Sequence, residues 1–441
     1  MITPPTDRET RARRRLIEAM PKAELHLHLD GSLRVDTALD LARTRGVDAP
    51  TDWLGMSAAL IAPMPCADQA ELLRAFDLPI ALMQDAEALE RITGELVETK
   101  AADGVRYVEI RWGPRLHVAR GLSLADGIAA VCAGARAAAH RTGTVVRLIC
   151  TALRSHDAEG NVELADTAAR FIDDGLTGWD LAGPEAAFPD PLDHARAYEA
   201  ARANGLRLTI HAGEWGGAAQ VRRALVVEPE RIAHGPGTID DPELCAELRA
   251  RGITLDLCPT SNWQAGIVPS VAAHPLARLH RAGVPVTLNT DDTTVSDITL
   301  SEEYRAAVEE IGLTLPELWS IDRRAPLPIA ALVGTDWILE SIVEGDVVRA
   351  AIGEPALLRL DENGSFHGST GCRTFTGSWV EANGRLVATQ TTMAGECPGG
   401  LGGQDGAVAE AIGGSLPAIE GDRLTLTKPG GEALVYRRAT E

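Results

Sequence analysis

Short apolar segments alternate with stretches of helical periodicity up to residue 290, and this alternation limits the fold more than any other feature. The eight apolar segments are Ala23–Leu29, Val105–Trp112, Val145–Thr151, Gly178–Ala182, Leu206–Ala212, Arg231–His234, Thr254–Cys258 and Val284–Thr290. The helical stretches between them include Ala67–Lys100, Leu124–Thr142, Leu164–Asp174 and Pro191–Ala203. Parallel strands need crossover helices, and strands covered on both faces are apolar throughout. The pattern therefore predicts an α/β protein of the (β/α)8 barrel class.

Polar side chains stand at the ends of several of these predicted strands. His26 and His28 lie one residue apart in PKAELHLHLDGSL, so both project to the same side of a strand. The other strand-end residues of this kind are His211, His234, Asp291 and Asp292. In a (β/α)8 barrel the carboxyl ends of the strands surround the active site. A doubly wound sheet is the structural alternative, but it would not gather residues from strands one, five, six and eight around one axis.

Three imidazoles and one carboxylate form a donor set that suits zinc. We expect one Zn²⁺ per chain, held by His26, His28, His211 and Asp291. Such a site leaves room for water, whose pKa the ion lowers toward neutrality, so a hydroxide nucleophile becomes available.

Acid and base groups accompany the expected zinc site. Glu214 lies three residues after His211 at the same strand end, where it can donate a proton. His234 and Asp292 can hydrogen-bond the hydroxide and the leaving group. The other histidines are interpreted as core or surface hydrogen-bonding groups: His117, His140, His156, His194, His274, His280 and His367.

The composition and charge of the chain argue against some classes of binding partner. The formal net charge of −21 repels phosphate backbones and anionic membranes, so we expect neither a nucleic-acid nor a membrane partner. The basic N-terminus lacks a following apolar segment, and no apolar run is long enough to span a membrane, so a cytoplasmic location is expected. The seven cysteines include no CxxC pair, which removes the usual thiolate zinc signature.

A second domain is indicated after about Asp322. The chain there becomes rich in Gly and Thr, with alternating apolar and polar residues separated by turn signals such as Glu362-Asn363-Gly364. A length of 441 residues also suggests about two or three domains. We predict a barrel domain over residues 8–327 and a small, mainly β domain over residues 331–438 with one helix near Asp405–Ile412.

Seven motifs together resemble the adenosine/AMP deaminase family of the amidohydrolase superfamily over about Pro21–Arg323: ELHLHLDGSL, YVEIRWGP, GWDLAGPE, HAGE, RIAHG, CPTSN and LNTDD. The resemblance implies a metal-dependent hydrolase that removes the 6-amino group of a purine nucleoside, most simply adenosine or deoxyadenosine. It implies the four zinc ligands given above. It also implies that Glu214 donates a proton to the purine and that His234 orients the attacking hydroxide.

The same resemblance implies the substrate contacts. Asp292 would contact the purine N7, Gly183 would contact N3 through its backbone, and Asp30 would hold the ribose hydroxyls with His28 nearby. Another 6-aminopurine compound, such as aminodeoxyfutalosine or adenine, is an alternative substrate, although Asp30 favours a ribosyl compound. A non-catalytic scaffold is a further alternative, but a scaffold needs none of the metal and acid/base residues.

The second domain resembles the META domain of bacterial envelope proteins related to the heat-shock protein HslJ, over about Leu332–Arg438. The motifs that carry this resemblance are LVGTDWILESI, FHGSTGCRTFTGSW, LVATQTTMAGECP and IEGDRLTLTKPGG. Cys372 and Cys397 lie in its two cysteine-bearing motifs, where they form either a disulfide in an oxidising compartment or two reduced core thiols. We expect a binding or structural role for this domain.

Overall fold

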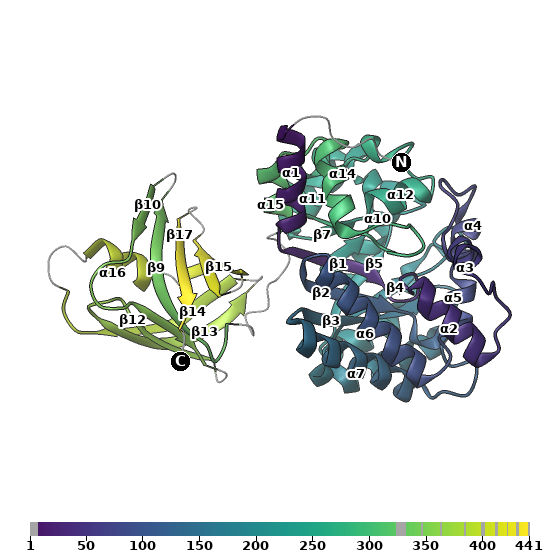
Figure 1. Cartoon of the computed structure of the whole chain (residues 1–441), viewed down its shortest axis with the longest axis horizontal. Helices are drawn as coiled ribbons and strands as arrows, with labels where there is room; N and C mark the ends of the chain where they lie inside the picture. The colour runs from purple at the N-terminus through teal and green to yellow at the C-terminus, as the bar shows by residue number, and fades with distance from the viewer. Residues whose placement is uncertain are drawn as a thin grey trace. The chain divides into compact units, whose positions relative to one another are not determined.

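The computed structural model divides the chain into two compact units, Met1–Asp322 and Arg323–Glu441 (Figure 1). It describes residues 8–322, 332–344, 347–361, 364–382, 385–397, 402–410, 413–420, 422–428 and 432–439. The predicted domain limits at 327 and 331 lie outside the described residues.

Eight parallel strands in sequence order form the sheet of the first unit. They are β1 (Lys22–His28), β2 (Val105–Trp112), β3 (Val145–Leu153), β4 (Leu176–Ala182), β5 (Arg207–His211), β6 (Arg231–Ala233), β7 (Thr254–Leu257) and β8 (Val286–Leu288). The sheet closes where β1 meets the chain after β8, because the amide of His28 donates to the carbonyl of Asp291 at 2.7 Å and the amide of Asp291 donates to that of His26 at 3.1 Å. The predicted (β/α)8 barrel is confirmed.

Helices surround these strands (Figure 1). They are α1 (Arg8–Ala19), α2 (Val35–Arg45), α3 (Trp53–Leu60), α4 (Gln69–Arg74), α5 (Asp77–Leu82), α6 (Ala86–Ala102), α7 (Leu124–Thr142), α8 (Ala158–Ala168), α9 (Ala195–Ala203), α10 (Gly217–Ala224), α11 (Pro242–Arg251), α12 (Pro259–Gln264), α13 (Leu276–Arg281), α14 (Leu300–Glu309) and α15 (Leu315–Asp322). Short 3₁₀ segments are η1 (Pro114–Leu116), η2 (Ala169–Asp174), η3 (Pro191–His194), η4 (Leu225–Val227), η5 (Pro236–Asp240) and η6 (Val271–Ala273).

The helical stretch predicted over Ala67–Lys100 consists of three helices, α4, α5 and α6. The carboxylate of Asp68 accepts a hydrogen bond from the amide of Glu71, and that of Asp85 accepts one from Ala88. Each aspartate therefore begins a new helix, since it satisfies a backbone donor that has no partner within the helix.

Buried apolar side chains of the strands and the surrounding helices form the core of this unit. Helices α6 and α7 approach closely at Gly134, where a Cβ atom would lie 2.2 Å from the carbonyl oxygen of Glu90. Only glycine allows that backbone distance.

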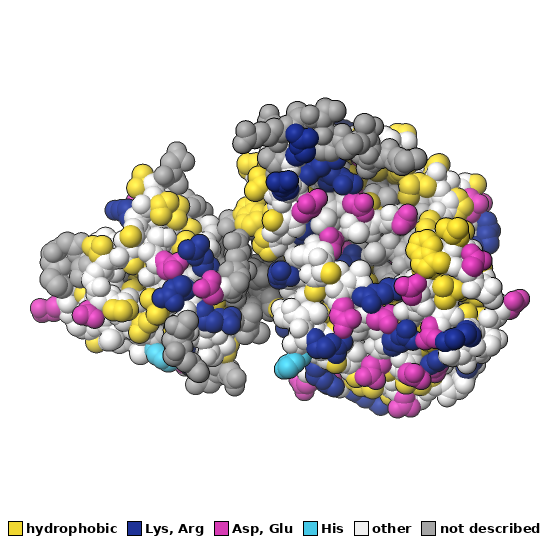
Figure 2. All heavy atoms as spheres, in the orientation of Figure 1, with side chains coloured by type: hydrophobic (Ala, Val, Ile, Leu, Met, Phe, Trp, Pro, Cys, Tyr) yellow, Lys and Arg dark blue, Asp and Glu magenta, His cyan; other side chains and the backbone are white. Residues whose placement is uncertain are grey.

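The visible surface of the first unit carries acidic and basic side chains interspersed with one another (Figure 2). Charged side chains of this unit form ion pairs, for example Arg45 with Asp85 at 3.0 Å and Arg91 with Asp40 at 2.6 Å. Such mixing is typical of a solvated surface, whereas nucleic-acid-binding faces concentrate basic residues. No helix among the described residues has the length and apolar character required to cross a membrane.

The second unit is a mainly β structure, as predicted. Its strands are β9 (Asp336–Glu344), β10 (Val347–Ala350), β11 (Leu357–Leu360), β12 (Ser365–Ser369), β13 (Thr374–Ala382), β14 (Arg385–Ala394), β15 (Gly413–Glu420), β16 (Arg423–Thr427) and β17 (Ala433–Arg438). They form one antiparallel sheet that closes through pairing of β9 with β17, and Trp337, Phe366 and Tyr436 are buried in its core. The predicted helix is α16 (Gly402–Ala409), while residues 411–412 lie outside the described residues.

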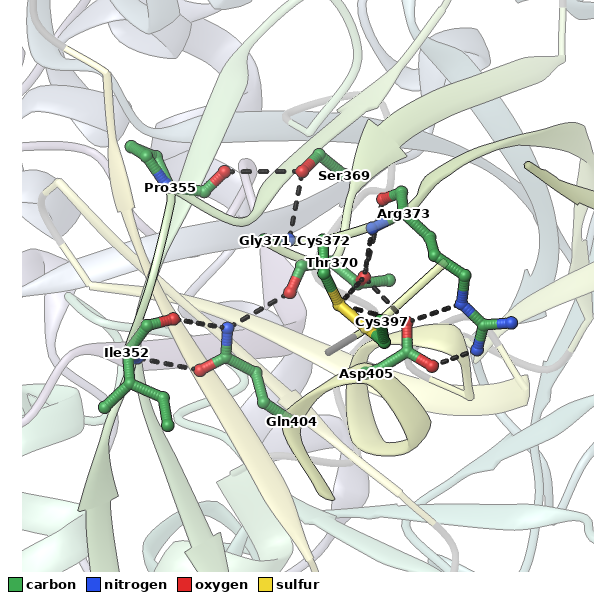
Figure 3. The surroundings of a disulfide bond; sticks show 10 residues. All are labelled: Ile352, Pro355, Ser369, Thr370, Gly371, Cys372, Arg373, Cys397, Gln404 and Asp405. Atoms are coloured by element: carbon green, nitrogen blue, oxygen red, sulfur yellow. Dashed lines mark hydrogen bonds and ion pairs between the residues drawn. A yellow bond between two sulfur atoms is a disulfide. The ribbon is translucent and has the colours of Figure 1, made fainter. Parts of the chain in front are cut away.

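Cys372 and Cys397 form a disulfide, which is the first of the two alternatives left open by the sequence (Figure 3). Their Cα atoms are 5.1 Å apart, within the usual range for this bond. Beside the disulfide, Asp405 of α16 accepts hydrogen bonds from the hydroxyl of Thr370 at 2.7 Å and from Nε of Arg373 at 2.9 Å. The bond thus joins the turn before β13 to the segment after β14, at the point where α16 packs.

Candidate active site

The histidines of β1 project together, as strand alternation requires. Their Nε2 atoms are 3.3 Å apart, and His26 is fully buried. The intervening Leu27 is also fully buried and belongs to the apolar core of the unit. The end of the strand therefore presents two imidazoles on one side and Leu27 on the other.

The remaining predicted zinc ligands converge on this pair. Nε2 of His211, at the end of β5, lies 3.1 Å from Nε2 of His28. Oδ1 of Asp291, after β8, lies 2.8 Å from Nε2 of His26 and 3.4 Å from Nε2 of His28. Nε2 of His234, after β6, lies 3.7 Å from the other oxygen of Asp291. Five side chains from four strand ends thus surround one point.

The charge states of these groups suit a divalent cation. Burial lowers the pKa of His28 to about 4 and lowers that of His26 well below its usual range, so both are neutral near pH 7. Burial opposes ionisation of Asp291, but His26, His234 and His28 together hold its pKa well below the usual range. Neutral imidazoles with an ionised carboxylate are the donor set that zinc prefers, and the residues therefore fit the ion.

Asp180 of β4 orients His211. Its Oδ2 lies 2.8 Å from Nδ1 of His211 and 3.3 Å from a guanidinium nitrogen of Arg111, and it is fully buried. Burial opposes ionisation of Asp180, but His211 and Arg111 hold its pKa well below the usual range. A carboxylate on the second ring nitrogen is common for metal-binding histidines. The sequence reasoning missed this residue, although an aspartate inside the apolar segment GWDLAG was a usable signal.

A chain of hydrogen bonds reaches His234 from α12 and α13. The amide of Leu276 donates to Nδ1 of His274, whose Nε2 lies 3.1 Å from Oδ1 of Asn262. The side-chain nitrogen of Asn262 lies 3.1 Å from Nδ1 of His234. This direction of donation leaves the proton of His234 on Nε2, the atom that faces the site. The sequence reasoning recognised CPTSN as a motif but assigned no role to Asn262.

Glu214 lies beside the cluster. Its Oε1 is 3.9 Å from Nε2 of His234. Burial, and to a smaller extent the neighbouring Asp291, raise the pKa of Glu214 to about 8. His234 and Asp291 both have positive φ, 67° and 68°, a conformation that is uncommon outside glycine. Strain of this kind is concentrated at functional sites, where the surrounding structure maintains it.

Asp292 offers an unused oxygen. The side chain is buried, and its Oδ1 has no hydrogen-bond partner among the described residues. Gly31 makes room for it, because a Cβ at residue 31 would lie 1.9 Å from that oxygen. Burial and the neighbouring Asp291, Asp30 and Glu214 raise the pKa of Asp292 well above its usual range.

Asp30 is held on both oxygens. Its Oδ1 lies 2.5 Å from Nε2 of His117, and its Oδ2 accepts a hydrogen bond from the amide of Gly113 at 3.1 Å. His117 is buried and hydrogen-bonded, which agrees with its interpretation as a hydrogen-bonding group. Gly183 follows β4 with φ of 101°, which favours glycine at this position.

Residues 21–327 match the adenosine deaminase family model, and residues 330–441 match the META domain. The chain belongs to the adenosine deaminase family. The adenosine deaminase of Mycobacterium ulcerans is 41% identical over 315 residues, which cover 67% of this chain and 86% of that relative. The family is metal-dependent, and the chain is a hydrolytic deaminase of adenosine-type purines. The scaffold alternative is therefore set aside.

Solved structures agree with this membership. An adenine deaminase from Arthrobacter aurescens superposes with a TM-score of 0.64 at 28% identity, covering 69% of this chain and 91% of that one. An amidohydrolase from Burkholderia ambifaria with bound Zn superposes with a TM-score of 0.65 at 30% identity, covering 73% and 87%.

Proposed function

We propose that the adenosine deaminase unit binds one zinc ion through His26, His28, His211 and Asp291, and that it hydrolyses adenosine or deoxyadenosine to the 6-oxo nucleoside and ammonia. The observation that carries this proposal is the convergence of three imidazoles and an ionised carboxylate from three strand ends, those of β1, β5 and β8. When bound, the zinc ion would lower the pKa of water and so supply the nucleophile that attacks C6.

The residues around the ion would donate a proton to the purine and orient the attacking oxygen. Glu214 is half-buried and has a pKa of about 8, so it is largely protonated at neutral pH and can protonate the purine N1. That proton makes C6 more electrophilic. His234 carries its proton on the nitrogen that faces Asp291 and Glu214, and it would orient the attacking oxygen. The proton of the added hydroxyl group would pass to the 6-amino group, so that ammonia leaves as the C6 carbonyl forms.

Two carboxyl groups would hold the substrate. The free oxygen of Asp292 lies in a buried position, and the raised pKa of this group allows it to donate a hydrogen bond to the acceptor N7. Asp30 would accept hydrogen bonds from the ribose hydroxyls, with His117 and the amide of Gly113 keeping its carboxylate in place. We further propose that the backbone of Gly183 contacts N3.

Adenine or aminodeoxyfutalosine is the alternative substrate, and the similarity to the Arthrobacter aurescens adenine deaminase favours adenine as the competitor. The variant Asp30→Ala separates the cases. It should raise KM for a nucleoside, because the ribose contact is lost, and leave turnover of adenine unchanged.

The test measures ultraviolet spectral change and ammonia release with zinc-quantified protein on adenosine, deoxyadenosine, adenine and aminodeoxyfutalosine. Glu214→Gln should keep zinc and lose about 10²–10⁴-fold in kcat, the usual contribution of general acid catalysis. His211→Ala should lose both zinc and activity, and chelation should abolish turnover until zinc is restored. Parental turnover by Glu214→Gln would contradict the assigned proton donor.

A further inference from the structure

Glu185 connects the end of β4 to the loop after β5. Its side chain is buried, and both of its carboxylate oxygens accept backbone hydrogen bonds from that loop. The amide of Gly213 donates to Oε1 at 2.7 Å, and the amides of Trp215 and Gly216 donate to Oε2 at 2.8 and 2.9 Å. One carboxylate therefore binds three amides of a four-residue segment, 213–216.

Glu214 is the residue enclosed by these contacts, since the amides on either side of it both donate to Glu185. Close packing also restricts the backbone of residues 213–216. Gly213 has φ of 72°, and a Cβ there would lie 2.5 Å from a methyl carbon of Val221 and 2.8 Å from the carbonyl oxygen of Gly217. The backbone that carries Glu214 is thus fixed from two sides.

The chemistry requires a carboxylate at residue 185. An ionised carboxylate has only acceptors, which matches three N–H donors. A glutamine has one acceptor oxygen, and its NH₂ group would face amide donors. Glu185→Gln keeps the size of the side chain and removes at least one of the hydrogen bonds, so it tests the contacts rather than the packing.

We propose that Glu185 is a positioning residue for the reaction, which acts by holding the 213–216 segment so that Glu214 meets the purine ring. This inference rests on the proposed role of Glu214. A displacement of about 1 Å at a reacting group can cost roughly 10²-fold in rate. Glu185→Gln should therefore lower kcat by about 10–100-fold, with little change in KM and in zinc content.

The experiment uses the full-length, zinc-loaded chain. Hydrogen exchange of the amides of residues 213–216 is measured beside kcat, KM and zinc content for Glu185→Gln. Glu302→Gln is the matched control: Glu302 also accepts a backbone hydrogen bond, from Thr299 at 3.0 Å, but at the start of α14. This control should keep parental exchange at 213–216 and parental kcat.

A double-mutant cycle with Glu214→Gln separates positioning from general destabilisation. If Glu185 acts through Glu214, its loss adds little to the Glu214→Gln defect, whereas a merely structural role multiplies the two defects. Faster exchange at 213–216 with a lowered, non-additive kcat supports the inference. Unchanged exchange in Glu185→Gln, or faster exchange with parental kcat, overturns it. Failure of the proposed function is recognised separately, by parental turnover of the single variant Glu214→Gln.

Discussion

Removal of the buried cation at Lys100 should destabilise the barrel unit strongly. Nζ of Lys100, on α6, lies 2.8 Å from Oε2 of Glu24 on β1, and both side chains are at most 1% exposed. The same Nζ donates to the hydroxyl of Thr290 at 3.1 Å, and Oε1 of Glu24 accepts from that hydroxyl and from the amide of Thr290. The ion pair therefore joins β1 to the segment that precedes Asp291.

Lys100→Met keeps much of the side-chain volume and leaves Glu24 buried without its counterion. Breaking a buried pair in this way costs about 3–5 kcal/mol, because the remaining charge is neither solvated nor paired. A unit of roughly 320 residues has an unfolding entropy near 0.7 kcal/mol per kelvin, so Tm should fall by about 4–8 °C.

Differential scanning calorimetry of metal-free, full-length protein measures this change, with Arg43→Met as the matched control. Arg43 pairs with Asp40 at the same distance of 2.8 Å, but its side chain is 80% exposed. Solvated pairs contribute up to about 1 kcal/mol, so the control should shift Tm by less than about 2 °C. Equal shifts for the two variants would refute the argument that burial makes the Lys100 pair costly to break.

Three further outcomes are expected. Burial lowers the pKa of His274 to about 3, so the unfolded chain takes up a proton at a higher pH than the folded chain does. Stability is therefore lost as the pH falls below about 6.5, and the loss reaches about 2 kcal/mol at pH 5. His274→Asn should show a smaller fall in Tm between pH 7 and pH 5 than the parent protein. The bond between Cys372 and Cys397 spans 25 residues, so replacing both cysteines by serine should lower the free energy of unfolding of the second unit by about 3.5 kcal/mol. Calorimetry measures this loss, and a rate assay should show unchanged deaminase turnover. His117→Phe removes the partner of Asp30 and should raise KM for adenosine more than for adenine, whereas equal effects would argue against a ribose contact.

The sequence was sufficient to predict the barrel and the place of the candidate site within it. Strand alternation places His26 and His28 on one side of β1, and a (β/α)8 topology brings the carboxyl ends of β5, β6 and β8 to the same place. Both conclusions depend on local periodicity, which the amino-acid order contains directly. The recurrence of polar residues at the ends of several strands also predicts His211, His234 and Asp291 as residues of the candidate site.

The tertiary structure alone decided which buried polar groups meet. Asp180, Glu185 and Asn262 contact partners that lie far away in the sequence. Each partner is determined by which loop or helix packs against which strand end. The sequence predicts only that Lys100 lies in a helix. The packing of that helix, α6, brings the ammonium group of Lys100 to Glu24 of β1. A buried charge must find a counterion or hydrogen bonds within the folded chain, and long-range packing determines which ones are within reach.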